Sequence, residues 1–412
     1  MKKSFSIPYK WELVIWLFLA FFLNQADKQI FNVLLSDIRD GLGLNNDDMG
    51  TIVMIMTIVY GVLVPVGGML ALKVRKKTIL VTALLVWSAA TLLTGYANSF
   101  LAMILLRSVA TGGGEAFYSP PAVALIADAH EDNTRSTALS LHQSALYVGF
   151  ILSSILAPMV ANAWGWQYAF YLFGGFGIIL AVVLFFRVKE SAPAVNDTRN
   201  QASMADALKT YFACPTALLL TLGCAGLQFV GMAFYTWMPT YLIEELGVSK
   251  ESAGFHAAFY FQLASIFGVI AGARISDRHV GKHSTIRAWV QAAALMLGAP
   301  FVFLMAGSSV LWIVNAAMFC FGFFKGAFDS NYYTALYDVT APKYRSSAAS
   351  FILMISFLVS AFAPKLLGAL STAGYTLSFG LQLMSYVLFF SAVPIMLAIF
   401  FTFRKDRLKI QY

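Results

Sequence analysis

The sequence predicts an all-α membrane protein with twelve transmembrane helices in two pseudo-symmetric six-helix bundles. Of its 412 residues, 59% are hydrophobic and only 12% are charged, whereas soluble domains carry about a quarter charged residues. Apolar runs close to the roughly 20 residues needed to cross a bilayer recur along the whole length. The longest polar interval, 189–210, leaves no room for a soluble domain of useful size.

The apolar runs define twelve expected spans. They lie at approximately 11–36, 47–72, 77–97, 99–128, 136–161, 166–188, 211–243, 251–276, 284–306, 308–337, 345–370 and 376–403. The first is interpreted as a retained span, because no small-residue cleavage site follows its apolar run. The three cysteines show neither metal-ligand spacing nor a disulfide framework, and are expected to be small core residues.

The distribution of Lys and Arg predicts the orientation of the chain. If both termini lie on one side, that side holds 22 of the 28 basic residues, the opposite loops hold two, and four lie inside spans. Because cytoplasmic loops carry an excess of Lys and Arg, both termini are expected in the cytoplasm, with the chain in the cell (inner) membrane. Topology therefore accounts for the net charge of +8, and no nucleic-acid partner is predicted.

The two halves of the chain repeat each other at a nearly constant offset. The stretches "DAHEDNTRSTA" (128–138) and "DVTAPKYRSSA" (338–348) both contain Asp, six residues and then Arg-Ser, 210 residues apart. A second pair, "GWQYAF" and "GYTLSF", has an offset of 209. Two parallel halves are therefore expected, related by an axis along the membrane normal. The predicted parts are an N-terminal bundle at 1–188, a cytoplasmic linker at 189–210 and a C-terminal bundle at 211–412.

Four stretches carry a resemblance to a known family. They are "NQADK" in the first span, "RSVATGGGEAFYSPP" (107–121) in the fourth, "WMPTYL" (237–242) in the seventh and "YDVTAPKYRSSA" after the tenth. On these stretches the chain resembles the major facilitator superfamily (MFS) of transporters, and within it the anion:cation symporter and spinster-like groups. The resemblance implies two halves that rock about a substrate site near the bilayer midplane.

A loop signature of that superfamily, Gly-x-x-x-Asp-Arg-x-Gly-Arg-Arg/Lys, occurs twice in altered form. The first copy keeps Gly68, Lys76 and Lys77 but has a leucine in place of the Asp, and the second keeps Asp277 and Arg278. By resemblance, these conformational loops tie helix ends together on the cytoplasmic face and favour the outward-facing state. The alternative interpretation is ordinary basic charge on the cytoplasmic side.

Two charges, Asp27 and Lys28, interrupt the first span. On insertion scales each costs about 2.5–3.5 kcal/mol at the centre of a helix, so such groups usually face a cavity or one another. Asn24, Asp27 and Lys28 fall at i, i+3 and i+4 and share one helix face. Adjacent side chains point about 100° apart, so each charge is expected to find its partner elsewhere. A structural polar anchor is the alternative.

The fourth span contributes Arg107 and Glu115. By resemblance, Glu115 is a proton-titrating carboxylate and Arg107 is a nearby charge partner. The related families space this pair by seven residues, but here the spacing is eight, which turns the pair about 100° further apart on a helix. Either the glycines at 112–114 hold a one-residue bulge, or Arg107 plays a different part. Asp27 and Glu115 are the predicted proton-coupling residues.

Other polar residues complete the predicted substrate site. In the tenth span, Lys325 and Asp329 stand at i, i+4, so they either pair with each other or leave Lys325 facing a cavity across from Glu115. The predicted substrate-binding residues are Lys28, Asn24, Arg107, Tyr118, His142, Gln143, Tyr147, Tyr235, Lys325 and Asp329. The neutral ones are individually more often packed or hydrogen-bonded helix residues than ligand contacts.

These patterns favour a secondary active transporter that moves a small organic anion, a sugar acid or another carboxylate, in symport with protons by alternating access. Buried carboxylates suit protons and buried cations suit the anion, with sodium as the alternative coupling ion. One rival is a spinster-like exporter of lysolipids or other amphiphiles, and another is a transporter-like sensor that does not transport. The expected partners are the anionic substrate, the coupling ion and the lipid bilayer. No catalytic, cofactor or metal motif is found, so an enzyme is not predicted.

Overall fold

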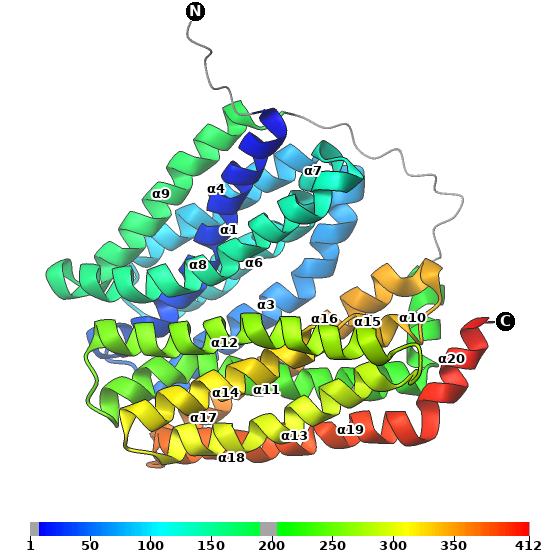
Figure 1. Cartoon of the computed structure of the whole chain (residues 1–412). Helices are drawn as coiled ribbons and strands as arrows, with labels where there is room; N and C mark the ends of the chain where they lie inside the picture. The colour runs from blue at the N-terminus through cyan, green and yellow to red at the C-terminus, as the bar shows by residue number, and fades with distance from the viewer. Residues whose placement is uncertain (1–7, 190–203, 412) are drawn as a thin grey trace, which may run out of the picture. The chain divides into compact units, whose positions relative to one another are not determined.

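The computed structural model describes residues 8–189 and 204–411, and this part of the chain is helical with no β-strand (Figure 1). Twelve of its helical stretches are long and apolar enough to cross a bilayer. They coincide with the predicted spans to within a few residues, so the all-α membrane fold class is confirmed. Of the predicted linker, residues 190–203 lie outside the described residues, and 204–210 belong to a helix.

The first six spans are built from nine helical segments. The segments that make them are α1 (Tyr9–Val33), α3 (Asn46–Lys73), α4 (Lys76–Thr94), α5 (Phe100–Met103), η1 (Ile104–Thr111), α6 (Gly112–Ala116), α7 (Ser119–Ala129), α8 (Asp132–Trp164) and α9 (Trp166–Arg187). A short helix, α2 (Leu35–Leu42), follows α1. The fourth span is the divided one, because a π-helix, η1, joins α5 to α6.

The last six spans begin after the short helix α10 (Met204–Phe212). The segments that follow it are α11 (Pro215–Glu244), α12 (Lys250–His279), α13 (Ile286–Gly307), α14 (Leu311–Asp329), α15 (Thr334–Tyr337), η3 (Pro342–Tyr344), α16 (Arg345–Ser360), α17 (Phe362–Thr372), α18 (Leu377–Phe390), α19 (Ala392–Leu397), η4 (Ala398–Thr402) and α20 (Phe403–Gln411). A second π-helix, η4, therefore interrupts the last span.

Capping residues fix several of the helix starts. The side chains of Ser99, Ser249 and Thr376 accept hydrogen bonds from backbone N–H groups three residues later, at the starts of α5, α12 and α18. These bonds satisfy donors that the first turn of a helix leaves unpaired. Gly165, at φ 103°, separates α8 from α9 in a conformation that other residues rarely adopt.

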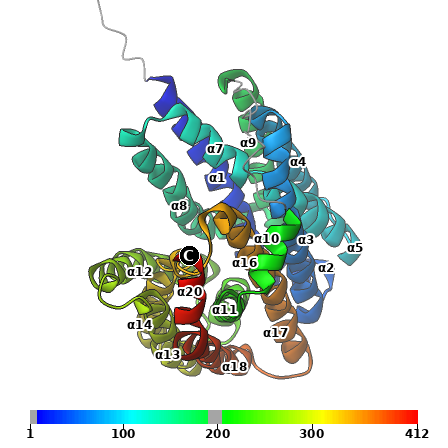
Figure 2. The same cartoon turned by 90° about the vertical axis from the view of Figure 1, so that its right-hand side faces the viewer.

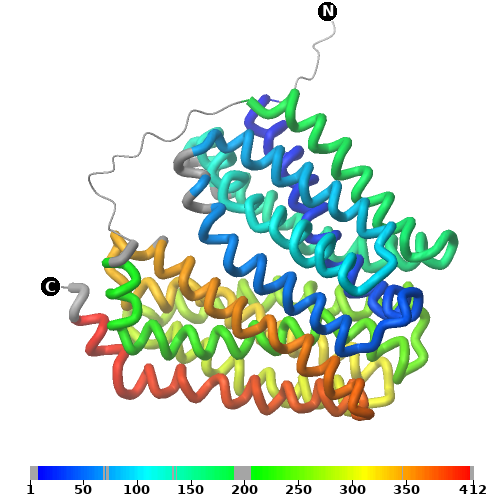
Figure 3. Tube along the Cα trace, turned by 180° about the vertical axis from the view of Figure 1, so that it is seen from behind, coloured from blue at the N-terminus to red at the C-terminus, as the bar shows by residue number. Residues whose placement is uncertain are grey.

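The described residues form two compact units. Unit 1 comprises residues 1–44 and 62–196, and unit 2 comprises residues 45–61 and 197–412. The first half of α3 therefore belongs to unit 2, where it lies beside α17 (Figure 3). A Cβ on Gly50 of α3 would lie 2.4 Å from the carbonyl oxygen of Pro364, so only glycine permits this approach. The division predicted from the sequence, with boundaries at 188 and 211, stays a prediction.

Within each unit, small residues bring spans into close contact. In unit 1, α1 packs along α8 and α4 along α9 (Figure 2). A Cβ on Gly174 of α9 would lie 2.4 Å from the backbone nitrogen of Leu92. In unit 2, α12 packs along α14, where a Cβ on Gly326 would lie 2.1 Å from the carbonyl oxygen of Ser265. Such contacts are the usual way in which membrane helices pack without a hydrophobic driving force.

The sequence repeat forms the same kind of ion-pair joint in each unit. In unit 1, Lys76 at the start of α4 pairs with Asp128 near the end of α7, with 2.5 Å between Nζ and Oδ2. Seven residues after that Asp, Arg135 donates a hydrogen bond to the carbonyl of Ala127 at 3.2 Å. This joint thus connects the ends of two spans, and Arg135 supplies a hydrogen bond to a carbonyl that the end of α7 leaves unpaired.

Unit 2 repeats the same contacts about 210 residues later. Arg287 at the start of α13 pairs with Asp338 after α15, with 2.7 Å between Nη1 and Oδ1. Arg345 donates to the carbonyl of Tyr337 at 3.3 Å. The Asp-x6-Arg-Ser repeat is therefore a structural joint between neighbouring spans, on the side that the charge distribution predicts to be cytoplasmic.

Candidate functional site

The polar face of α1 meets two charged residues of the fourth span inside unit 1. Asn24 and Asp27 are buried, whereas the Lys28 side chain keeps 25% of its accessible surface. Asp27 and Lys28 have separate partners, as their spacing on the helix predicts. The result is two ion pairs side by side between the same two spans.

The first ion pair joins Asp27 to Arg107. Arg107 Nη1 binds Asp27 Oδ2, and Nη2 donates to the Asp27 carbonyl oxygen at 2.7 Å. Thr91 of α4 donates from Oγ1 to the other carboxylate oxygen at 2.8 Å. The guanidinium also lies over the ring of Phe31, 5.4 Å from its centroid. Both Asp27 carboxylate oxygens and both terminal Arg107 nitrogens thus have a partner where water is excluded, whereas Arg107 Nε has no hydrogen-bond partner among the described residues.

The second ion pair joins Lys28 to Glu115. Lys28 Nζ lies 3.4 Å from Glu115 Oε2, and it donates to Asn24 Oδ1 at the same distance. Both Glu115 oxygens are buried, and no described side chain donates a hydrogen bond of good geometry to either. Asp27 and Arg107 also interact electrostatically with Glu115. Glu115 is therefore the less satisfied of the two carboxylates, since its ion-pair contact with Lys28 lies at the edge of hydrogen-bond distance.

A π-helix explains how Arg107 and Glu115 both reach α1 despite their spacing of eight residues. In a regular α-helix, eight residues place two side chains about 80° apart. The π-helix η1 adds one residue to the fourth span just before the glycines, so the pair behaves as if seven residues apart. The predicted bulge is present, but it occupies Ile104–Thr111 and ends where the glycine run begins.

Tyr118 and His142 form a buried stack beside this cluster. Tyr118 donates its single hydroxyl proton to the carbonyl of Leu17 at 2.7 Å. In the 3.1 Å contact between Tyr118 and His142 Nε2, the hydroxyl oxygen therefore accepts and His142 donates. His142 stacks on Phe21, with 4.8 Å between ring centroids. Its Nδ1 atom is buried without a hydrogen-bond partner among the described residues. A role of these two residues in substrate binding stays a prediction.

The remaining predicted substrate residues are divided between the units. Gln143 is exposed and Tyr147 is half-buried on α8 of unit 1. In unit 2, Tyr235 packs edge-on against Phe261. Lys325 and Asp329 form the mutual ion pair that the i, i+4 spacing allows, with 2.6 Å between Nζ and Oδ2.

The predicted conformational loops show unequal contacts. Lys76 forms the joint with Asp128, and Lys77 lies over the ring of Phe185, 5.2 Å from its centroid. Asp277 is exposed and lies 3.9 Å from Arg287 Nη2, and Arg278 is exposed. Gly68 is part of α3, but its surroundings lie outside the described residues.

The sequence of this twelve-span chain matches a known family of membrane proteins. The sequence model of the Major Facilitator Superfamily matches residues 17–364. The chain belongs to the major facilitator superfamily. Among the relatives of this MFS protein, Protein spinster homolog 1 of Xenopus laevis is 28% identical over 391 residues, 89% of this chain and 74% of that protein.

A relative of another kind and a solved structure complete the comparison. The hexuronate transporter of Bacillus subtilis (strain 168) is 27% identical over 275 residues, which are 65% of this chain and 64% of that transporter. A bacterial homolog of the human lysosomal transporter Spinster, in an inward-facing and occupied conformation, matches with a TM-score of 0.84. It is 20% identical and covers 98% of this chain and 99% of its own, so the likeness concerns the fold.

Sequence reasoning missed several polar residues of this MFS transporter. Thr91 carries no sequence signal, because single threonines are common in membrane spans. Asp128 and Asp338 begin the two copies of the repeat, and Lys76 and Arg287 precede them by 52 and 51 residues, so an ion-pair joint could have been proposed from these nearly equal spacings. Among the described residues, no group of three or more His, Cys, Asp or Glu side chains could hold a metal ion.

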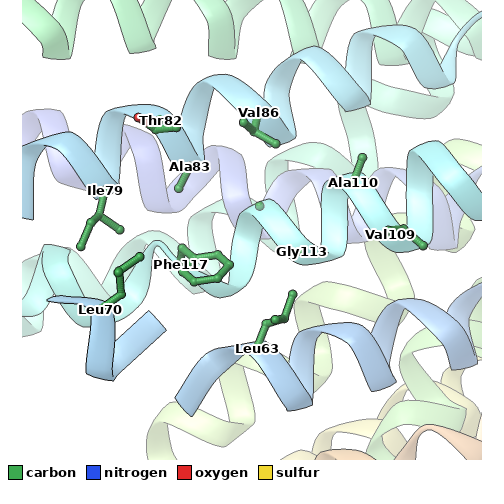
Figure 4. A pocket seen from close by; sticks show the side chains of 11 residues that line it. Leu63, Leu70, Ile79, Thr82, Ala83, Val86, Val109, Ala110, Gly113 and Phe117 are labelled. Atoms are coloured by element: carbon green, nitrogen blue, oxygen red, sulfur yellow. The ribbon is translucent and has the colours of Figure 1, made fainter. Parts of the chain in front are cut away.

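An apolar cavity of about 380 Å³ lies in unit 1 on another side of the fourth span (Figure 4). Its lining residues are Leu63, Leu70, Ile79, Thr82, Ala83, Val86, Val109, Ala110, Gly113, Gly114 and Phe117. None of the four charged residues of the two ion pairs is among them. The cavity therefore borders the π-helix through Val109 and Ala110 without touching the charged cluster.

Proposed function

We propose that this MFS transporter moves a small organic anion in symport with protons. The observation that carries the proposal is the Lys28–Glu115 pair, in which a buried carboxylate without a hydrogen-bond donor among the described residues faces a cation with a partly exposed side chain. Intramembrane ionisable groups of this kind commonly mark substrate and proton pathways. Lys28 is the proposed anchor of the substrate carboxylate, and Glu115 is the proposed proton carrier.

Charge balance makes binding of the two ligands mutually dependent. With neither ligand bound, Lys28 and Glu115 neutralise each other. A proton on Glu115 removes the negative charge that faces the half-buried Lys28, whereas a substrate anion alone adds a negative charge to the site. Both situations are costly in a low-dielectric site. When proton and anion bind together the site is neutral again, so each favours the binding of the other.

The Asp27–Arg107 pair has a different proposed part in the same cycle. Both side chains are almost fully buried, and Thr91 and the Asp27 carbonyl supply further hydrogen bonds. Such a pair is costly to open. In place of the proton-coupling role predicted for Asp27 and the substrate-binding role predicted for Arg107, we assign this pair to holding α1 against the fourth span, so that Lys28 and Glu115 stay in register during transport.

The relatives support a sugar acid as the anion. The hexuronate transporter is named for a sugar carboxylate, and it aligns with about two thirds of this chain. A sugar acid combines one carboxylate, which suits Lys28, with hydroxyl groups, which suit neutral hydrogen-bonding side chains.

Reconstituted vesicles test the proposal directly. Proteoliposomes enclosing a pH-sensitive dye should acidify when glucuronate is added outside, and an imposed inward proton gradient should drive uptake of labelled glucuronate. Uptake driven by a sodium gradient alone would replace the proton with sodium. The absence of coupled movement for a panel of sugar acids and small dicarboxylates would refute anion symport.

The spinster relatives favour a second candidate, export of an amphiphile such as a lysolipid. Protein spinster homolog 1 aligns with 89% of this chain, against 65% for the hexuronate transporter. The same vesicles, loaded with a labelled lysolipid, distinguish the candidates. Transport of lysolipid without transport of sugar acids would decide for the exporter.

The orientation in the membrane also belongs to the proposal. We infer cytoplasmic termini from the strong excess of Lys and Arg in one set of loops. Cysteines introduced at Asp40 and at His283, in opposite sets of loops, should react with an impermeant maleimide from opposite sides of the membrane.

A further inference from the structure

Thr111 makes a hydrogen bond that follows the register of the π-helix. Its Oγ1 atom donates to the carbonyl of Leu106, five residues earlier, at 2.9 Å. Elsewhere in unit 1, Thr94 donates from Oγ1 to the carbonyl of Ala90, four residues earlier, at 2.8 Å, as in an ordinary α-helix. Both threonines are fully buried. The Thr111 contact therefore belongs to the wider turn, in which backbone bonds run from i to i+5.

The π-helix η1 has two faces with different surroundings. On one face, Arg107, Ser108 and Thr111 are fully buried. On the other, Val109 keeps 45% of its accessible surface, and with Ala110 it borders the apolar cavity (Figure 4). The extra residue of the π-helix is thus accommodated on the side of the apolar cavity, while the buried face keeps its contact with α1.

We propose that Thr111 is a positioning residue: by holding the π-turn, it places Arg107 on Asp27 and Glu115 on Lys28 at the same time. If the turn relaxed to an α-helix with the same number of residues, Arg107 would rotate about 100° relative to Glu115. One of the two ion pairs would then be lost. The consequence for transport rests on the proposed function, whereas the consequence for the ion pairs does not.

Four variants test the positioning role. Thr111→Val keeps the shape but removes the hydroxyl, and Thr111→Ser keeps the hydroxyl. Deletion of Ala110 returns the Arg107–Glu115 spacing to seven, so an ordinary α-helix would align the pair without a bulge. The fourth variant combines the deletion with Thr111→Val. Thr94→Val is the matched control, because it removes a buried hydroxyl that bonds within a regular α-helix.

The expected result is a specific pattern of rescue. Thr111→Val should lower proton-driven uptake roughly tenfold or more, as small misplacements of working groups do, and should change its pH profile. Thr111→Ser and Thr94→Val should resemble the wild type. The deletion variant should transport, and adding Thr111→Val to it should have little further effect. Equal effects of Thr111→Val and Thr94→Val, or an undiminished Thr111→Val effect in the deletion variant, would overturn the proposal.

Thermal melting tests the same role independently of transport. In a double-mutant cycle, Thr111→Val and Asp27→Asn should be non-additive, because both act on the Arg107–Asp27 contact. The serine variant should melt like the wild type, which keeps the test informative even if the deletion variant does not fold. Additive melting shifts would contradict the positioning role. If the wild type moves no sugar acid with protons, the proposed function fails, but this cycle still decides the inference.

Discussion

Lys28 and Glu115 pair across two spans, with 3.4 Å between Nζ and Oε2, while the neighbouring Asp27 is taken by Arg107. Four charges in one part of unit 1 thus form two separate pairs. The pairs differ in their surroundings, because Arg107 is fully buried whereas Lys28 keeps a quarter of its side-chain surface. This difference suggests which pair exchanges partners with a ligand and which pair stays closed.

Replacement of Lys28 should weaken anion binding. In Lys28→Ala, the substrate carboxylate would lose a charge-assisted hydrogen bond, which is worth about 1.5–3 kcal/mol. The Kd for a sugar acid should therefore rise roughly tenfold to a hundredfold. Titration calorimetry on purified protein measures this change. Arg187→Ala removes an exposed basic residue that pairs with Glu12, and serves as the control with unchanged affinity.

The Asp27–Arg107 pair should contribute strongly to stability when either partner is removed alone. Asp27→Asn and Arg107→Gln should each destabilise unit 1 by about 3–5 kcal/mol, because each leaves a buried charge without its partner. The double variant should be more stable than the sum of the two losses predicts. Melting curves in one detergent give the comparison, and strictly additive losses would contradict a direct pair.

The joint at Asp338 should make stability fall as the pH rises. Burial raises the pKa of the Asp338 carboxyl above its usual value, against the opposing effect of Arg287. The folded state then binds this proton more tightly than the unfolded state does, so the contribution to stability is complete below the unfolded pKa and is lost as the pH rises through the folded pKa. Melting temperatures measured across that pH range should show this slope, and Asp338→Asn should lack it.

Hydrophobic length and charge placement predicted most of the fold. Runs of apolar residues gave the twelve spans, since a bilayer imposes one length on every crossing. The Asp-x6-Arg-Ser repeat indicated two related halves, and the structure shows that each copy takes part in an ion-pair joint. These features depend on neighbours in the sequence or on periodic spacing, which a single sequence contains.

The partners of the buried charges could not be predicted, because they depend on contacts between distant helices. Nothing in the spacing of Asp27 and Lys28 selects Arg107 for one and Glu115 for the other. Lys365 is a further example, since it pairs with Asp47, 318 residues away in the sequence. The bulge was predicted at the glycines and this position was wrong, since the π-helix lies at Ile104–Thr111; spacing reveals an extra residue without saying which turn absorbs it.

The coupling role of Glu115 is the central claim, and Glu115→Gln tests it most directly. Gln keeps the shape of the side chain but cannot exchange a proton, and it frees Lys28 to hold the anion. Proteoliposomes with this variant should still exchange labelled sugar acid across the membrane, but an imposed proton gradient should no longer drive its accumulation. Accumulation equal to that of the wild type, with the same dependence on pH, would contradict the account.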